Sequence, residues 1–208
     1  MSWHSGRAYC FLPALILTGL LLTACGQGSK VPQDHYYRLN LASPPKLAQP
    51  TLSGTLAVKR FAANGLLQGR GITHSQPGNP SEIESYHYHH WIDIPPLMLQ
   101  ELLLGYLQAA SVASDIVAGD GDIKPDYLIK GRIKRLEHIT GSPSEGLIEL
   151  DLSLIQSDSR TLILHRVYQQ KVRTSKQTIT ATVMALNHAL EKIYAAFLED
   201  LARIPDKS

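Results

Sequence analysis

The amino-acid sequence predicts an α/β fold of the α+β type, a two-layer sandwich in which two long helices cover one face of a mostly antiparallel or mixed sheet. Two stretches carry apolar residues at the i, i+3, i+4 spacing of an amphipathic helix. The other regular segments alternate apolar and polar residues, which is the period of a half-buried strand. Three of these segments are joined by short, turn-rich links that are too brief for a crossover helix, so we expect them to pair as an antiparallel meander.

The first half of the chain is expected to contribute three extended segments and one helix. The extended segments are residues 35–41, 55–61 and 84–92, and the Gly-, Asn- and Pro-rich residues 62–81 are expected to form a long loop. A helix is predicted at about 96–111, because two prolines suit its first turn and one apolar face follows, formed by Leu99, Leu102, Leu103, Tyr106, Leu107 and Ala110.

The second half is expected to contain a short strand at 115–117, the meander and a final helix. The meander strands are centred on residues 127–134, 147–154 and 162–171, and the first of them carries Lys130, Arg132 and Lys134 on its polar side. The helix is predicted at about 178–201. Its apolar stripe can pack against the sheet and comprises Ile179, Val183, Leu186, Leu190, Ile193, Phe197 and Leu201.

The first 24 residues are expected to be a cleaved export signal. Arg7 supplies a basic head, and the apolar run 11–24 would be about 21 Å long as a helix, short of the ~30 Å hydrocarbon layer. The run ends in Leu22-Thr23-Ala24-Cys25, which resembles the bacterial lipobox. In that motif the cysteine thiol receives a diacylglycerol, the chain is cleaved before the cysteine, and the new amine is acylated. Cys25 is therefore the predicted lipid-attachment residue; the alternative is an ordinary thiol near a general secretory cleavage site.

Cleavage before Cys25 would leave a nearly neutral, single-domain chain. The mature protein would hold 19 basic and 18 acidic residues, since residues 1–24 contain one Arg and no acid, so nothing in its charge favours a nucleic-acid partner. It would have no second cysteine and hence no disulfide or thiol nucleophile. We expect residues 25–34 to form a lipidated tether and residues 35–203 a single periplasmic domain. In the enteric-type lipoproteins that this motif resembles, Asp after the cysteine is associated with retention in the inner membrane, so the resemblance, with Gly26 at this position, implies the outer membrane.

The most conspicuous candidate site is the segment 86–91, Tyr-His-Tyr-His-His-Trp. Regular alternation would place His87 and His89 on one face and His90 on the other, too few ligands together for zinc, so no metal site is predicted. Aromatic side chains with polar tips suit protein interfaces, so Tyr88 and Trp91 could belong to a docking edge. The alternative for Trp91 is an anchor in the core.

Other motifs give weaker signals. Arg70 could bind an acidic partner or a lipid head group, or could be an ordinary exposed loop residue. Asp120, Asp122 and Asp126 form a fragment of a calcium loop but lack the glutamate that completes it, which favours a solvated turn. The sequence has no Gly-x-Ser-x-Gly elbow, and it predicts no catalytic set.

The order of these landmarks resembles the family of ABC-type transport auxiliary lipoproteins. The matching features are Cys25, Tyr36-Tyr37-Arg38-Leu39, the strand at 56–61, Arg70-Gly71-Ile72, the segment 86–91 leading into Pro95-Pro96, and residues 126–131. The resemblance implies an α/β sandwich tethered to the outer membrane from the periplasmic side. It further implies a non-catalytic accessory protein that has no cofactor apart from the acyl chains on Cys25. Its implied partners are an MCE-domain protein and an ABC permease and ATPase, which together move lipids between the two membranes.

The sequence is compatible with a homo-oligomer and with direct lipid binding by the domain, and it does not identify the lipid cargo. One rival interpretation is a lipoprotein factor for envelope assembly or cell-wall synthesis unrelated to lipid transport. A second is a periplasmic hydrolase or metal-binding protein that uses the histidines of segment 86–91.

Overall fold

The computed structural model describes residues 31–119, 121 and 123–204. The predicted signal peptide, Cys25 and most of the predicted tether lie outside these residues. The chain divides into units 1–33 and 34–208, and the fold below is that of the second. Its elements are β1 (His35–Tyr37), β2 (Leu52–Val58), a short 3-10 helix η1 (Gly65–Gln68), β3 (Gly71–Gln76), β4 (Asn79–Trp91), α2 (Pro95–Ala110), β5 (Ala113–Ala118), β6 (Tyr127–Ile139), β7 (Glu145–Gln156), β8 (Thr161–Arg173) and α3 (Ile179–Ala202).

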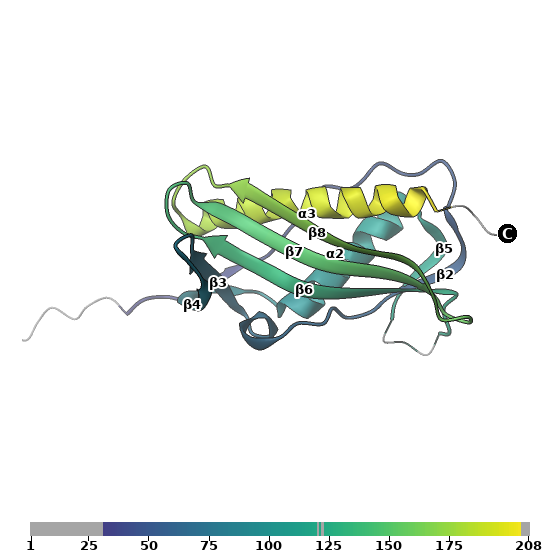
Figure 1. The fold of residues 1–208 in the computed structure, drawn as a ribbon, viewed down its shortest axis with the longest axis horizontal. Coiled ribbons are helices and arrows are strands. Elements are labelled where there is room, and N and C mark those ends of the chain that lie inside the picture. Colours follow the sequence, from purple (N-terminus) through teal and green to yellow (C-terminus); the bar gives the residue numbers. More distant parts are fainter. Residues whose placement is uncertain (1–30, 120, 122, 205–208) are drawn as a thin grey trace, which may run out of the picture. The chain divides into compact units, whose positions relative to one another are not determined.

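The eight strands form one mixed sheet, and the two long helices pack on one of its faces (Figure 1). The predicted fold class is therefore confirmed. β6, β7 and β8 pair as the expected antiparallel meander. The other edge of β6 is shared by two parallel strands, because β2 pairs with residues 127–129 and β3 pairs with residues 137–139. β5 extends the sheet beyond β2, and β4 and then β1 extend it beyond β3.

The helices begin and end close to their predicted limits. Pro95 and Pro96 occupy the first turn of α2, which ends where Ser111 adopts the left-handed conformation. The N-cap of α3 is Thr178, whose hydroxyl accepts a hydrogen bond from the Ala181 amide at 3.2 Å. None of the described helices combines the length and the apolar character that crossing a bilayer requires.

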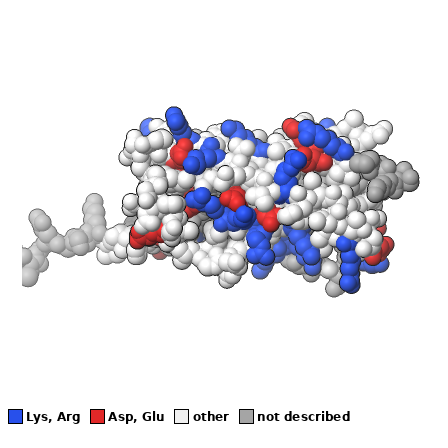
Figure 2. Space-filling view, in the orientation of Figure 1, with Lys and Arg blue, Asp and Glu red and all other residues white. Residues whose placement is uncertain are grey.

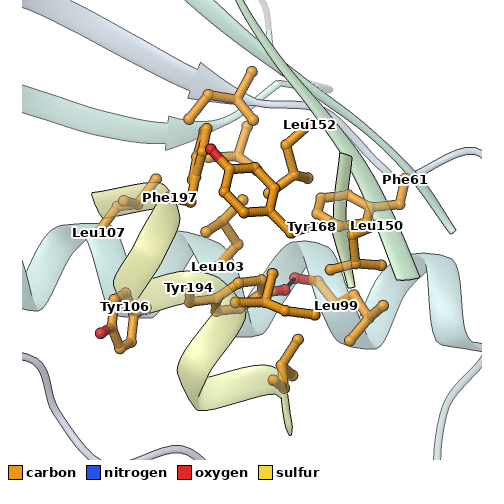
Figure 3. Close-up of a cluster of buried hydrophobic side chains, with 14 of the residues drawn as sticks. Phe61, Leu99, Leu103, Tyr106, Leu107, Leu150, Leu152, Tyr168, Tyr194 and Phe197 are labelled. Atoms are coloured by element: carbon orange, nitrogen blue, oxygen red, sulfur yellow. Dashed lines mark hydrogen bonds between the residues drawn. The ribbon is translucent and has the colours of Figure 1, made fainter. Parts of the chain in front are cut away.

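The core lies between the helices and the sheet (Figure 3). Tyr194 is fully buried on α3 and donates a hydrogen bond to the Leu99 carbonyl of α2 at 2.8 Å, which joins the two helices. Phe197 meets the ring of Tyr168 from β8 edge to face, with the centroids 5.9 Å apart. Each large apolar side chain buried here contributes about 1.5–3 kcal/mol, so α3 is held mainly by this face.

Three strand predictions in the first half are corrected by the structure. Residues 62–81, expected to be a loop, contain η1, β3 and the start of β4, because β3 and β4 form a hairpin that extends the sheet from β6. β2 begins and ends three residues earlier than predicted. Regular pairing in the first strand stops at Tyr37, although Leu39 is still buried. β3 was missed because its sequence, Gly-Ile-Thr-His-Ser-Gln, has no apolar alternation, and because one of its two partner strands lies more than 60 positions away.

Candidate functional site

Arg70 and Trp91 lie together at the junction of η1, β3 and β4. The Arg70 Nε donates to the Trp91 carbonyl at 3.1 Å, and the Trp91 amide donates to the Arg70 carbonyl at 2.6 Å. The Arg70 guanidinium also lies over the ring of Tyr36, 5.3 Å from its centroid, in a cation–π arrangement. Trp91 is only 1% exposed, so it is a core anchor, and its side chain does not belong to a surface docking edge.

The exposed aromatic residues of this region are Tyr36, which is 56% exposed, and Tyr88, which is 45% exposed. Tyr36 stands beside the ring of His90, and His90 lies 3.4 Å from the Asp34 carboxylate. No described contact joins Tyr88 to Arg70. We call Tyr36, Arg70, Tyr88 and His90 the aromatic edge, a set of polar-tipped and cationic side chains of the kind that protein interfaces favour.

Segment 86–91 does not follow regular alternation throughout. Gly71 pairs with His90 and Thr73 with Ser85, so β4 carries extra residues between these pairs and bulges away from β3. His89 therefore lies beside Tyr86, which regular alternation would place on the opposite face, and beside Tyr37, whose hydroxyl is 3.0 Å from the His89 Nδ1. Across residues 31–119, 121 and 123–204 no three His, Cys, Asp or Glu side chains are grouped so that they could hold a metal ion.

A buried polar network that the sequence did not indicate joins β4, β6 and the β6–β7 turn. His138 accepts or donates at both ring nitrogens, with Nδ1 2.7 Å from the Tyr86 hydroxyl and Nε2 2.7 Å from the Ser144 Oγ. Burial raises the pKa of Tyr86; it also lowers the pKa of His138, and the nearby His74 lowers it further. His138 is 6% exposed and Ser144 is 7% exposed. A serine paired with a histidine is a pattern of nucleophilic catalysis, but this hydroxyl is covered, so the network ties the strands together.

In the acidic stretch at 120–126, Asp120 and Asp122 lie outside the described residues. Asp126 accepts a hydrogen bond from the Thr55 amide at 2.7 Å. Its carboxylate also fills the space next to Gly54, which has a φ of +92° that favours glycine. Asp126 thus joins β2 to the start of β6.

The basic residues of β6 lie on the sheet face opposite the helices, where Figure 2 shows Lys and Arg side chains interspersed with Asp and Glu over β6, β7 and β8. Lys134 is paired with Glu149 at 2.8 Å. Among the described residues, Lys130 and Arg132 have no acidic partner within ion-pair distance.

A family model described as "ABC-type transport auxiliary lipoprotein component" matches residues 37–196, from the end of β1 to the last turns of α3. The chain belongs to this family. The protein is therefore an accessory lipoprotein of an ABC-type transport system, and family membership implies a membrane-anchored location in the cell envelope. No curated protein matches the sequence significantly.

The fold is shared with solved structures. A crystal structure of protein XCC0632 from Xanthomonas campestris, assigned to family DUF330, has a TM-score of 0.69 and 20% identity and covers 79% of this chain and 92% of that chain. A crystal structure titled as an uncharacterized protein has a TM-score of 0.65 and 14% identity, covering 81% of this chain and 99% of that chain. At these identities the likeness establishes the fold alone.

Proposed function

We propose that this protein is an outer-membrane-anchored, periplasmic accessory lipoprotein of an MCE/ABC-type system that moves lipids between the two membranes. The observation that carries the proposal is the family match over residues 37–196, which spans nearly the whole α+β unit. The lipobox-like ending at Cys25 and the Gly that follows it support the anchor and its outer-membrane location. In this role the domain docks and positions its partners and performs no catalysis.

The anchor and the tether have complementary physical roles in this proposal. Two or three acyl chains on Cys25 hold the protein stably, since a single chain gives only marginal membrane binding. The ten residues 25–34 then span at most about 35 Å when fully extended. The domain can therefore reach a partner that projects across the periplasm while its lipid stays in the outer membrane.

We propose that the aromatic edge is the surface that contacts the MCE-domain protein. Tyr88 and Tyr36 expose large rings with polar tips, and the Arg70 guanidinium is already oriented by the Trp91 carbonyl and the Tyr36 ring. A side chain held as Arg70 is loses little conformational freedom on binding, which is typical of the residues that dominate an interface.

The test is affinity purification of the tagged full chain from gently solubilised envelopes, followed by mass-spectrometric identification of the proteins recovered. We expect an MCE-domain protein with its ABC permease and ATPase. Tyr88→Ala should reduce that recovery at least severalfold, whereas Leu162→Ala, at an even more exposed apolar residue of β8, should not. Recovery of cell-wall or assembly factors in place of an MCE protein would contradict the proposal, as would an intact mass without acyl groups on Cys25.

A further inference from the structure

A cavity of about 500 Å³ opens on the sheet face away from the helices, between η1, the β3–β4 hairpin and the second half of β6. Its volume is in the range of small-molecule binding sites. Leu66 of η1 and Ile83 of β4 line it and are 48% and 49% exposed. Large aliphatic side chains half exposed at the same cavity offer an apolar surface that the fold itself does not cover.

A bulge in β6 brings Arg135 to this cavity, next to two other basic side chains. Ile133 pairs with Leu150 and Arg135 pairs with Glu149, so β6 carries one extra residue between them. With regular alternation Arg135 would point to the same side as the buried Ile133, toward the helices. The bulge instead places Arg135 beside Arg132 and Lys134, and all three line the cavity.

A buried carboxylate orients one of these arginines. The Glu137 side chain is 3% exposed, and its Oε1 accepts a hydrogen bond from the Nε of Arg135. This contact uses only the Nε–H of the guanidinium. The two terminal amino groups of Arg135, Nη1 and Nη2, have no acceptor among the described residues. Glu137 is thus a positioning residue that holds a planar, fork-shaped donor at the cavity.

The charges of the lining leave a net attraction for an anion. Lys134 is neutralised by Glu149 at 2.8 Å, and Arg135 by Glu137. Arg132 is exposed and forms no ion pair within 4.0 Å among the described residues, because Asp151, which lies opposite it on β7, contacts His165 instead. The cavity therefore offers one guanidinium without an ion-pair partner and the free donors of a second, the groups that bind phosphate in a bidentate manner.

We propose that this cavity binds the head of an anionic phospholipid, with Arg132 and Arg135 on the phosphate and with Leu66 and Ile83 against the start of the acyl chains. A free phosphate would make no use of the two aliphatic side chains, and an uncharged lipid would make no use of the arginines. This ligand goes beyond the docking role proposed above, and its test needs no partner protein.

The test uses the full chain purified from membranes in a non-ionic maltoside detergent. Dioleoyl phosphatidylglycerol or dioleoyl phosphatidylcholine is added in equal amounts, and the one-to-one lipid adduct is quantified by native mass spectrometry. We expect a phosphatidylglycerol adduct that is much more abundant than the phosphatidylcholine adduct. Arg132→Gln should weaken phosphatidylglycerol binding about tenfold, because it removes charge-assisted hydrogen bonds.

Two matched variants separate this site from general surface properties. Lys130→Gln removes the same charge from an exposed residue of the same strand that does not line the cavity, and it should leave the adduct unchanged. Leu66→Ser should weaken the adduct severalfold, whereas Leu162→Ser, at an exposed residue elsewhere on the sheet, should not. Since these residues are exposed, we expect unfolding temperatures close to that of the wild type.

Three results would overturn the proposal. Equal binding of the two lipids would show that the head-group charge is not recognised. Equal losses from Arg132→Gln and Lys130→Gln would show a diffuse charge effect without a site. An adduct unaffected by Leu66→Ser would show a bare anion site without a place for the acyl chains.

Discussion

We expect His138 to make the folded protein less stable as the pH falls below neutral. Burial and the neighbouring His74 lower its pKa from the ordinary value of about 6.5. Between the pKa of His138 in the folded state and its pKa in the unfolded state, the folded protein binds fewer protons. The resulting loss of unfolding free energy is absent well above pH 6.5 and grows as the pH falls through 6.5 toward the folded-state pKa. At pH 5.5 this single group can lower the free energy of unfolding by at most about 1.4 kcal/mol.

The structure explains why protonation is unfavourable at this position. His138 is 6% exposed, and its ring lies between the Tyr86 hydroxyl and the Ser144 Oγ. Both hydroxyls can rotate to accept from an imidazolium, so the hydrogen bonds themselves need not be lost. The cost comes from placing a charge in a site shielded from water, close to His74.

The assay is urea unfolding of the full chain in non-ionic detergent at pH 7.5 and pH 5.5, followed by tryptophan fluorescence. Trp91 is buried at the end of β4, so its emission reports the loss of this region. His138→Gln should reduce the difference in stability between the two pH values by up to about 1.4 kcal/mol. His87→Gln, a change at an exposed residue of the same region, should not.

Part of the pH dependence should survive in the His138→Gln variant. The pKa of His89 is also lowered, by burial first and then by His35 and His90. Protonation of His89 therefore also destabilises the folded protein as the pH falls. The reasoning would be refuted if His138→Gln and wild type lost the same stability between pH 7.5 and pH 5.5, because the buried imidazole would then carry none of the effect.

Two further predictions concern packing and buried charge. Gly131→Ala should cost about 1–3 kcal/mol of stability, because the added methyl group would lie 2.6 Å from the Phe61 ring. Phe61→Leu should cost less in the Gly131→Ala background than in the wild type, because the smaller side chain relieves this clash. Additive losses in denaturant unfolding would contradict this coupling. Asp200→Ala should cost about 1.5–3 kcal/mol, because the buried carboxylate accepts from the Tyr168 hydroxyl at 2.6 Å and from Arg166 at 2.7 Å. Tyr168→Phe should then cost less in the Asp200→Ala background than in the wild type, and equal costs would show that the two groups are not coupled.

The helices were predictable because their signals are local. The prolines that open α2, the Thr178 cap of α3 and the apolar stripes of both helices lie within the segments themselves, so each limit was predicted to within one residue. The meander was predictable for a related reason, since its short links leave antiparallel neighbours as the only arrangement.

The candidate sites depended on features that local periodicity does not contain. The bulge in β4 places His89 beside Tyr86, and the bulge in β6 brings Arg135 to the face of Arg132. A bulge is defined by the register with the neighbouring strand, so the alternation within one strand does not reveal it. Regular alternation would have placed the members of each of these two pairs on opposite faces.

By itself the sequence determined the fold class, the two helices, the meander and the family resemblance, because each depends on the order and spacing of nearby residues. The tertiary structure decided which side chains share a surface. It placed Trp91 in the core and left Tyr88 exposed, and it joined His138 to Ser144 and to Tyr86, which is 52 positions from His138. Pairing between distant strands sets these neighbours, and that pairing results from the packing of the whole sheet against its helices.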